Sequence, residues 1–220
     1  MRKTFDEQLE QLHINLIKMG SLCEEAISLS AKMILESEEG LKSKIVPLEE
    51  EIDHMEREIE TRCMRLLLQQ QPVARDLRAI SAALKMISDM ERIGDQAADI
   101  AELAPYLAGK PGQELLPIGE MARATVVMVT DSVEAYVKNN LTLARQVMQE
   151  DDEVDALFLK LKESLTDLIR RSEIGAETAL DLLMAAKYFE RIGDHAVNIA
   201  EWVEYSITGF HKTSEKSEEV

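Results

Sequence analysis

The chain is poor in residues that interrupt helices and in residues that favour β-sheets. Its 220 residues include only five prolines and nine glycines, and aromatic residues make up 4%. Hydrophobic residues nevertheless make up 45%. Most of them are Leu, Ile, Met and Ala, which are good helix formers except for the intermediate Ile. The composition predicts an all-α protein with long helices.

Long hydrophobic runs and cysteine motifs are also absent. No segment approaches the roughly 18 to 20 apolar residues that span a bilayer. Residues 1–12 lack the hydrophobic stretch of a signal peptide, so we expect a cytoplasmic protein. The two cysteines, Cys23 and Cys63, form no CxxC motif. We expect both to be unreactive thiols buried between helices.

Positive charge is scarce. The chain has 25 Lys and Arg against 42 Asp and Glu, a formal net charge of −17. This charge repels DNA and RNA, so we expect no nucleic-acid binding. Basic proteins, metal cations or the surface of a membrane protein are better suited as partners.

Apolar residues recur at alternating spacings of three and four, which predicts long helices that each pack on one face. Three helices are expected over about residues 4–37, from Ile45 to just before Pro72, and from Leu77 to just before Pro105. Pro47 lies near the start of the second helix, where a first-turn proline is tolerated. After a Gly- and Pro-rich linker at 109–113, three more are expected, ending at Asn139–Asn140, after Leu168 and near Ile207.

The second half of the chain repeats the first. ERIGDQAADIAE at 91–102 returns 99 positions later as ERIGDHAVNIAE at 190–201, with nine of twelve letters the same. An offset of 102 aligns the earlier helices. We therefore predict two tandem repeats of an antiparallel three-helix bundle, at 1–108 and 114–208, followed by a polar tail at 209–220.

The repeated phrase places acids where an apolar residue is expected. Glu91, Asp95 and Asp99 lie on one helix face, and the matching residues of the second copy are Glu190, Asp194 and Asn198. In each copy a glycine lies in the same helical turn as the glutamate, Gly94 after Glu91 and Gly193 after Glu190, although a mid-helix glycine is about 1 kcal/mol less favourable than alanine. This glycine predicts a close approach by another part of the protein.

The neighbouring helices carry acids with the same spacing, at Glu49 and Asp53 and at Asp151 and Asp155. Each repeat could therefore present two facing Glu/Asp-x-x-x-Asp motifs. Such a cage has only oxygen ligands, which suit Mg, Mn, Fe or Ca.

Other interpretations remain open for these residues. In a chain with 42 acids, Glu49 and Asp53 could belong to a solvated face. The repeated glutamates could instead pair with arginines, the candidates being Arg92, Arg191 and Arg78. His195 points about 100° away from Asp194 around the helix and is not expected to be a ligand.

Taken together, QPVARDLR at 71–78, the two ERIGD phrases and Met19-Gly20 resemble the PhoU family over almost the whole chain. The resemblance implies a pair of three-helix bundles related by a pseudo-twofold axis. It also implies a negative regulator of the phosphate-starvation response and of phosphate import. Such a protein would couple the ATPase subunit of a phosphate ABC transporter to a sensor histidine kinase and would reach the membrane only through these partners. We also expect a homodimer, which the many Met and Leu positions expected on the surface permit.

The resemblance also implies multinuclear iron or zinc, while the oxygen ligands alone would also permit Mg or Mn. Carried over by position, the metal ligands would form one set of four in each repeat, and one further residue would extend each set. They are Glu49, Asp53, Glu91 and Asp95 in the first repeat, Asp151, Asp155, Glu190 and Asp194 in the second, and Asp99 and Asn198 as extensions.

The sequence shows no catalytic triad, no phosphate-binding glycine loop and no basic pocket, so we expect neither an enzyme nor a direct phosphate sensor. The acidic faces are expected to dock partners, with or without metal. Three alternatives stay open: a paralogue that serves another phosphate transporter, a metal-free adaptor, and a carboxylate di-iron protein. The di-iron ligands would include Glu10 and His13 with Glu51 and His54.

Overall fold

The computed structural model describes residues 2–36, 39–70, 72–107 and 116–210. Within them are six long helices and one short 3₁₀ helix, η1 (Glu39–Leu41). The long helices are α1 (Arg2–Glu36), α2 (Lys42–Gln70), α3 (Ala74–Leu107), α4 (Ile118–Lys138), α5 (Leu141–Arg170) and α6 (Ala176–Thr208). The all-α prediction is confirmed. The expected linker at 109–113 and residues 211–220 of the expected tail lie outside the described residues.

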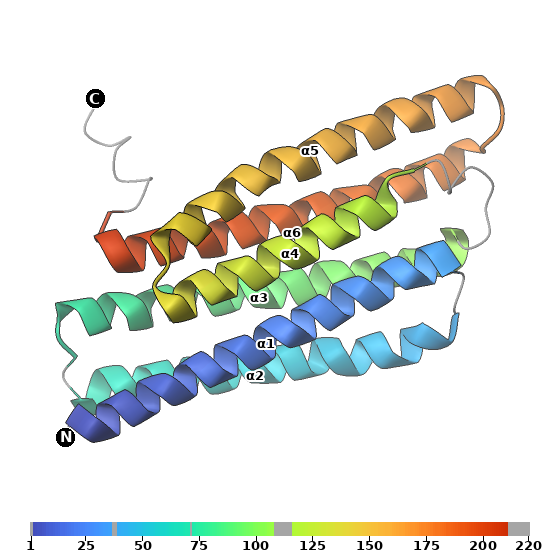
Figure 1. Cartoon of the computed structure of the whole chain (residues 1–220). Coiled ribbons are helices and arrows are strands. Elements are labelled where there is room, and N and C mark those ends of the chain that lie inside the picture. The colour runs from blue at the N-terminus through green and yellow to red at the C-terminus, as the bar shows by residue number, and fades with distance from the viewer. Residues whose placement is uncertain (1, 37–38, 71, 108–115, 211–220) are drawn as a thin grey trace, which may run out of the picture.

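The helices form two antiparallel three-helix bundles side by side (Figure 1). Helix α2 packs on α1 and α3, and α5 packs on α4 and α6. The bundles meet through α1 against α4 and through α3 against α6, and the α3–α6 contact is the most extensive of all helix pairs. Four helices therefore form the centre of the molecule, while α2 and α5 lie at its two outer edges (Figure 1).

The apolar residues that recur at spacings of three and four in the sequence form the core. Leu12, Leu16 and Met19 of α1 are fully buried. Cys23 and Cys63 are also fully buried and form no disulfide. Burial raises the pKa of each thiol to about 12, so both stay protonated and unreactive near neutral pH.

Two prolines lie deeper inside helices than the sequence predicts. Helix α3 does not stop before Pro105 but continues to Leu107. Leu107 is fully buried, and its packing offsets the one backbone hydrogen bond that proline removes in the last turn. Helix α2 begins at Lys42, so Pro47 lies beyond the first turn rather than within it.

The turn between α4 and α5 follows the prediction. Asn139 has a left-handed backbone with φ of 51° and ends α4. Asn140 caps α5, since its side-chain oxygen accepts a hydrogen bond of 3.1 Å from the backbone N–H of Leu143. Asparagine is among the best residues for both positions.

The two mid-helix glycines allow close approach of the outer helices. A Cβ at Gly94 would lie 3.0 Å from Cδ1 of the fully buried Ile52 on α2. A Cβ at Gly193 would lie 3.1 Å from Oδ1 of Asp151 on α5. The glycines therefore let α2 approach α3, and α5 approach α6, at the level of the acidic residues.

None of the helices in the described ranges is long and apolar enough to cross a membrane.

We predict that Gly94→Ala destabilises the protein despite the better helix propensity of alanine. Overpacking costs about 1–3 kcal/mol, and the alanine recovers about 1 kcal/mol. The expected net loss of about 1 kcal/mol lowers Tm by roughly 2–4 °C, measured by thermal unfolding followed by circular dichroism.

Two matched variants complete this test. In an Ile52→Val background, which removes the nearest atom, Gly94→Ala should be close to neutral. Gly40→Ala should not destabilise, because a Cβ there meets nothing within 4 Å. A Gly94→Ala protein as stable as the wild type would show that α2 can move away without loss.

Candidate cation sites on two acidic helix faces

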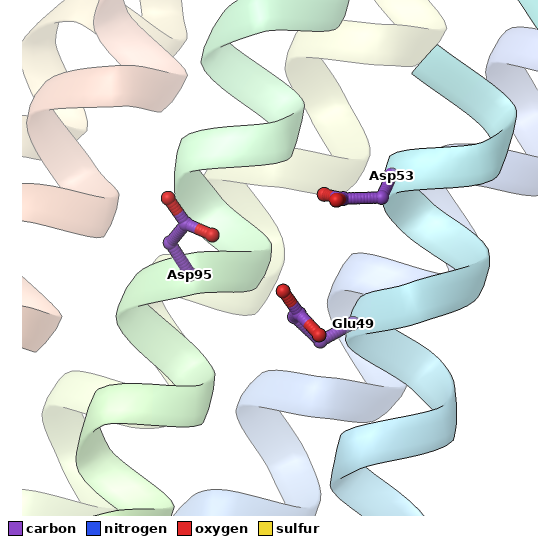
Figure 2. A group of neighbouring side chains, drawn as sticks. All are labelled: Glu49, Asp53 and Asp95. Carbon is purple, nitrogen blue, oxygen red and sulfur yellow. The ribbon is translucent and has the colours of Figure 1, made fainter. Parts of the chain in front are cut away.

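Three carboxylates of the first repeat converge in a group. Glu49 and Asp53 lie one turn apart on α2 and face Asp95 on α3 (Figure 2). One oxygen atom from each lies within 4.8 Å of the others. All three side chains are half-buried, and burial, followed by Asp53 and Asp95, raises the pKa of Glu49. We call this group the α2–α3 acidic cluster.

Glu91 lies beside this cluster rather than within it. Its carboxylate is 3.4 Å from Nε of Arg92, whose Nη1 lies 3.1 Å from Asp95. Burial is the largest cause that raises the pKa of Glu91, followed by Asp95. Glu56 of α2 also raises it. The expected pairing of Glu91 with Arg92 is therefore present, but Arg92 is 59% exposed and neutralises the site only in part.

The second repeat gathers its acids less tightly. Burial, then Asp155, Asp194 and Glu190, raises the pKa of Asp151 to about 6. Oδ1 of Asp151 is buried and has no hydrogen-bond partner among the residues that the structure describes. These four acids are thus near neighbours. Within the described part of the chain, however, only the α2–α3 acidic cluster has three ligand oxygens that all lie within 4.8 Å of one another. We call Asp151, Asp155, Glu190 and Asp194 the α5–α6 acidic set.

A charge difference separates the two repeats. Lys187 forms an ion pair with Glu190, and its ammonium lies 5.7 Å from the ring of Phe158. The equivalent positions of the first repeat are Ser88 and Glu56, where the serine hydroxyl donates to the carboxylate at 3.4 Å. The acidic face of the second repeat therefore has an additional positive charge from Lys187, whereas that of the first repeat has an additional negative charge from Glu56.

The two predicted extensions face the centre of the molecule. The amide of Asn198 donates to Oδ1 of Asp89 on α3 at 3.0 Å, and Nδ1 of His195 lies 2.9 Å from the same oxygen. Asp99 is near Arg191 of α6, which opposes the rise in its pKa caused first by burial and then by Glu102. Both residues thus make contacts across the α3–α6 interface.

The residues proposed for a di-iron centre have other partners. His13 packs edge-on against Tyr136, with ring centroids 5.6 Å apart, and burial lowers its pKa. Glu51 forms an ion pair of 2.7 Å with Lys18. Among the described residues, the side chains proposed for a di-iron centre do not come together in a group that could hold a metal ion.

Sequence reasoning missed three features. It did not include Glu56 or Lys187, although the offsets of 102 and 99 that align the repeats would have exposed the difference. It missed Asp89, the partner of His195 and Asn198. The expectation that the chain has no basic pocket is wrong, because a cavity of about 510 Å³ is lined by Arg57, Arg62 and Arg65 among others.

The donor chemistry of the α2–α3 acidic cluster fits a hard cation. Oxygen-only ligands suit Mg, Mn, Ca and iron, whereas structural zinc prefers Cys and His. The carboxylates repel one another, and this repulsion adds to burial, the larger cause, in raising the pKa of Glu49. A bound cation would relieve that repulsion. The fold and these faces define a class of protein: a two-repeat helical bundle whose candidate ligand groups lie between its outer and central helices.

Comparison with known proteins agrees with this class. A family model described as the PhoU domain matches residues 16–104 and again residues 118–203. The chain belongs to the PhoU family. The double match also supports the two repeats found in the sequence.

Similar proteins match along nearly the whole chain. The phosphate-specific transport system accessory protein PhoU homolog of Clostridium acetobutylicum is 36% identical over 210 residues, which cover 94% of this chain and 96% of that protein. The homolog of Pseudomonas aeruginosa is 31% identical and covers 93% of this chain and 86% of its own length.

Two solved structures have the same fold. The crystal structure of PhoU from Pseudomonas aeruginosa superposes with a TM-score of 0.87 at 31% identity, covering 94% of this chain and 100% of that one. PhoU from Streptococcus pneumoniae superposes with a TM-score of 0.84 at 24% identity, covering 94% and 98%.

We predict that Asp151→Asn stabilises the metal-free protein at pH 7. The pKa of Asp151 is raised from 3.8 to about 6 in the folded chain. Between these values the folded state holds a proton that the unfolded state has lost, so stability falls as pH rises through this window. The amide removes this loss, and after discounting for the partial exposure of the side chain the gain at pH 7 is on the order of 1 kcal/mol.

The check is Tm measured from pH 4 to 7 in chelator-treated protein. The difference between variant and wild type should be near zero at pH 4 and grow towards pH 7. Glu163→Gln, at an exposed position of the same helix and not among the acids that raise the pKa of Asp151, serves as the control and should show no such growth. A variant less stable than the wild type at pH 7 would contradict the prediction.

Proposed function

We propose that this protein is a non-enzymatic negative regulator of the phosphate-starvation response and of phosphate import. It couples the ATPase subunit of a phosphate ABC transporter to a sensor histidine kinase, acting in the cytoplasm as a homodimer. Family membership over both repeats carries the proposal, together with relatives named accessory proteins of a phosphate-specific transport system. The kinase rests on the resemblance described above, whereas the homodimer and the cytoplasmic location are expectations from the sequence pattern.

The acidic faces are proposed as the docking surfaces of this adaptor. The first lies between α2 and α3 and the second between α5 and α6, and α2 and α5 form opposite edges of the molecule (Figure 1). A net charge of −17 favours basic partner surfaces and accelerates their encounter. Two similar faces on one rigid bundle can engage two partners at once.

We further propose that the α2–α3 acidic cluster binds a divalent cation. Glu49, Asp53 and Asp95 would hold it, with Glu91 close by. The cation would neutralise part of the charge of this face and fix α2 against α3. The α5–α6 acidic set is expected to bind cations more weakly, because Lys187 already supplies a positive charge to Glu190.

The cation proposal predicts a rise in Tm when Mn²⁺ is added to chelator-treated protein. At a hundredfold excess over Kd, binding stabilises by about 2.7 kcal/mol, or roughly 5–10 °C for a chain of this size. The rise should shrink as the pH falls, since protons compete for Glu49, whose pKa is raised by burial and then by Asp53 and Asp95.

Asp53→Asn should remove most of this rise. Glu50→Gln makes the same change of charge on the same helix at an exposed position outside the cluster, so it should keep the rise. Equal behaviour of the two variants would leave only non-specific binding to an acidic surface. Elemental analysis of untagged protein then identifies the native metal.

The regulatory proposal predicts high alkaline phosphatase activity, or high activity of another phosphate-starvation reporter, in a strain that lacks this gene and grows in excess phosphate. The intact gene should restore low activity. Unchanged low activity in the deletion strain would indicate a paralogue that serves another transporter.

A four-site variant tests the docking faces in the same strain. Replacing Glu91, Asp95, Glu190 and Asp194 by their amides should abolish repression without unfolding the protein. The control carries four amides at exposed acids away from both faces, namely Glu25, Glu163, Glu173 and Glu177, and should repress fully. Full repression by the first variant would exclude the acidic faces as docking surfaces.

A further inference from the structure

The end of the molecule at the turn between α2 and α3 exposes large apolar side chains. Leu68 and Phe210 are 78% and 79% exposed, more than any other large hydrophobic side chain that the structure describes. Val73, Leu77 and Met64 are each about half exposed. We call Met64, Leu68, Val73, Leu77 and Phe210 the apolar tip. Exposed apolar residues gathered at one place on a protein mark an interaction site.

The turn between α2 and α3 brings four of these residues together. Met64 and Leu68 lie one turn apart on the same face of α2, close to its C-terminal end. Val73 directly precedes α3. Its carbonyl accepts a hydrogen bond of 2.9 Å from the backbone N–H of Leu77, so these two residues lie one helical turn apart.

Phe210 reaches the same end of the molecule from the second repeat. Helix α6 ends beside the start of α3 (Figure 1). Nε of Arg78 on α3 donates to the carbonyl of Ser206 on α6 at 3.4 Å. The side chain of Arg78 also lies against Gly209, 3.8 Å from the position that a Cβ would have. Phe210 is the next residue, so the tip combines residues of α2 and α3 with the chain that follows α6.

The fold does not require apolar residues at these positions. With the offsets that align the repeats, the residues that replace the first four members of the tip are Thr166, Arg170, Ser172 and Ala176. They lie at or near the turn between α5 and α6, at the opposite end of the molecule (Figure 1). All four are polar or small, yet both repeats form the same three-helix bundle. The apolar character is therefore expected for a contact surface and not for a packing need.

Basic residues accompany the apolar tip, although the whole chain has a net charge of −17. Residues 61–80 contain four arginines and one acid, Asp76. Arg65 and Arg75 are exposed, while Arg62 and Arg78 are half-buried. The apolar side chains at this end are therefore combined with a local excess of positive charge.

The acids of α2 are too far away to cancel this local charge. Glu60 is the last acid of α2 and lies eight residues before Leu68, which is about 12 Å at the helical rise of 1.5 Å per residue. The α2–α3 acidic cluster lies farther still along the helix. Salt screens exposed charges beyond about 8 Å at physiological ionic strength. A surface that approaches this end therefore meets arginines and apolar side chains first.

We propose that the apolar tip inserts into the surface of an anionic lipid bilayer. Its side chains enter the boundary between the headgroups and the acyl chains. Arg65 and Arg75 donate to lipid phosphates, while their apolar stems lie along the acyl region. The members of the tip carry no hydrogen-bonding side-chain group and lie at the end of an elongated bundle (Figure 1). Such an end suits a fluid apolar layer, which needs no matching shape, better than a specific protein groove.

This inference goes beyond the regulatory proposal, in which the protein reaches the membrane only through its partners. Direct contact would hold the bundle on the bilayer by one end. The acidic faces lie farther along the helices and would remain in water, where partners can reach them. Binding to pure lipid involves neither a transporter nor a kinase, so its success or failure is independent of the regulatory proposal.

Co-sedimentation of the chelator-treated full chain with lipid vesicles at physiological salt tests the proposal. The two probes are vesicles of phosphatidylglycerol mixed with phosphatidylcholine and vesicles of phosphatidylcholine alone. The wild type is expected to bind the anionic vesicles at least about fivefold more tightly, because one arginine near an anionic surface contributes about that factor. Arg65→Gln/Arg75→Gln should remove most of this preference.

The apolar contribution is tested by Leu68→Gln/Leu77→Gln. Glutamine keeps a helix propensity close to that of leucine, so the helices should persist. Binding to the anionic vesicles should weaken by about tenfold or more, because the leucines no longer bury apolar surface. Thermal unfolding followed by circular dichroism confirms that each variant is folded.

Two matched controls make the same changes away from the tip. Leu159→Gln/Leu180→Gln replaces exposed leucines of the second repeat. Arg170→Gln/Arg171→Gln replaces exposed arginines at the turn between α5 and α6. Both controls should bind the vesicles as the wild type does.

Absence of binding to the anionic vesicles would overturn the proposal, as would equal losses in the tip variants and their controls. Binding that appears only after a divalent cation is added would also overturn it, because a cation can bridge the acidic faces to lipid phosphates. If the wild type does not bind vesicles but Leu68→Gln/Leu77→Gln loses repression in the reporter strain, the tip is a docking surface for a protein and not for a membrane.

Discussion

The packing of α3 against α6 is the contact on which the rest of the structure depends. It is the most extensive interface between helices and joins the two repeats. Asp89 of α3 binds both His195 and Asn198 of α6, so the interface has polar as well as apolar contacts. Each central helix uses its other side to hold an outer helix, and a glycine at the contact lets that helix approach closely. The position of both acidic faces follows from this arrangement.

Similar sequence in the two repeats does not give equal sites. Ile52 fills the space beside Gly94 in the first repeat, whereas the buried oxygen of Asp151 lies against Gly193 in the second. Lys187 adds a positive charge to the second face, and Glu56 adds a negative one to the first. Electrostatic energies at such short distances are large in half-buried sites, so under the cation proposal these few differences would give the two faces different affinities for cations.

The sequence by itself determined the number of helices, their apolar faces, the duplication and the Asn139–Asn140 turn, because these depend on local periodicity and local capping. It also placed the acids on common helix faces. Only the tertiary structure decided that Asp95 and not Glu91 joins Glu49 and Asp53, that Asn198 turns to Asp89, and that Arg57, Arg62 and Arg65 line one cavity. It also decided that Pro105 lies inside a helix, through the burial of Leu107. These outcomes depend on the rotation and separation of neighbouring helices. A shift of a few ångströms there makes or removes a hydrogen bond, and sequence periodicity does not define positions so finely.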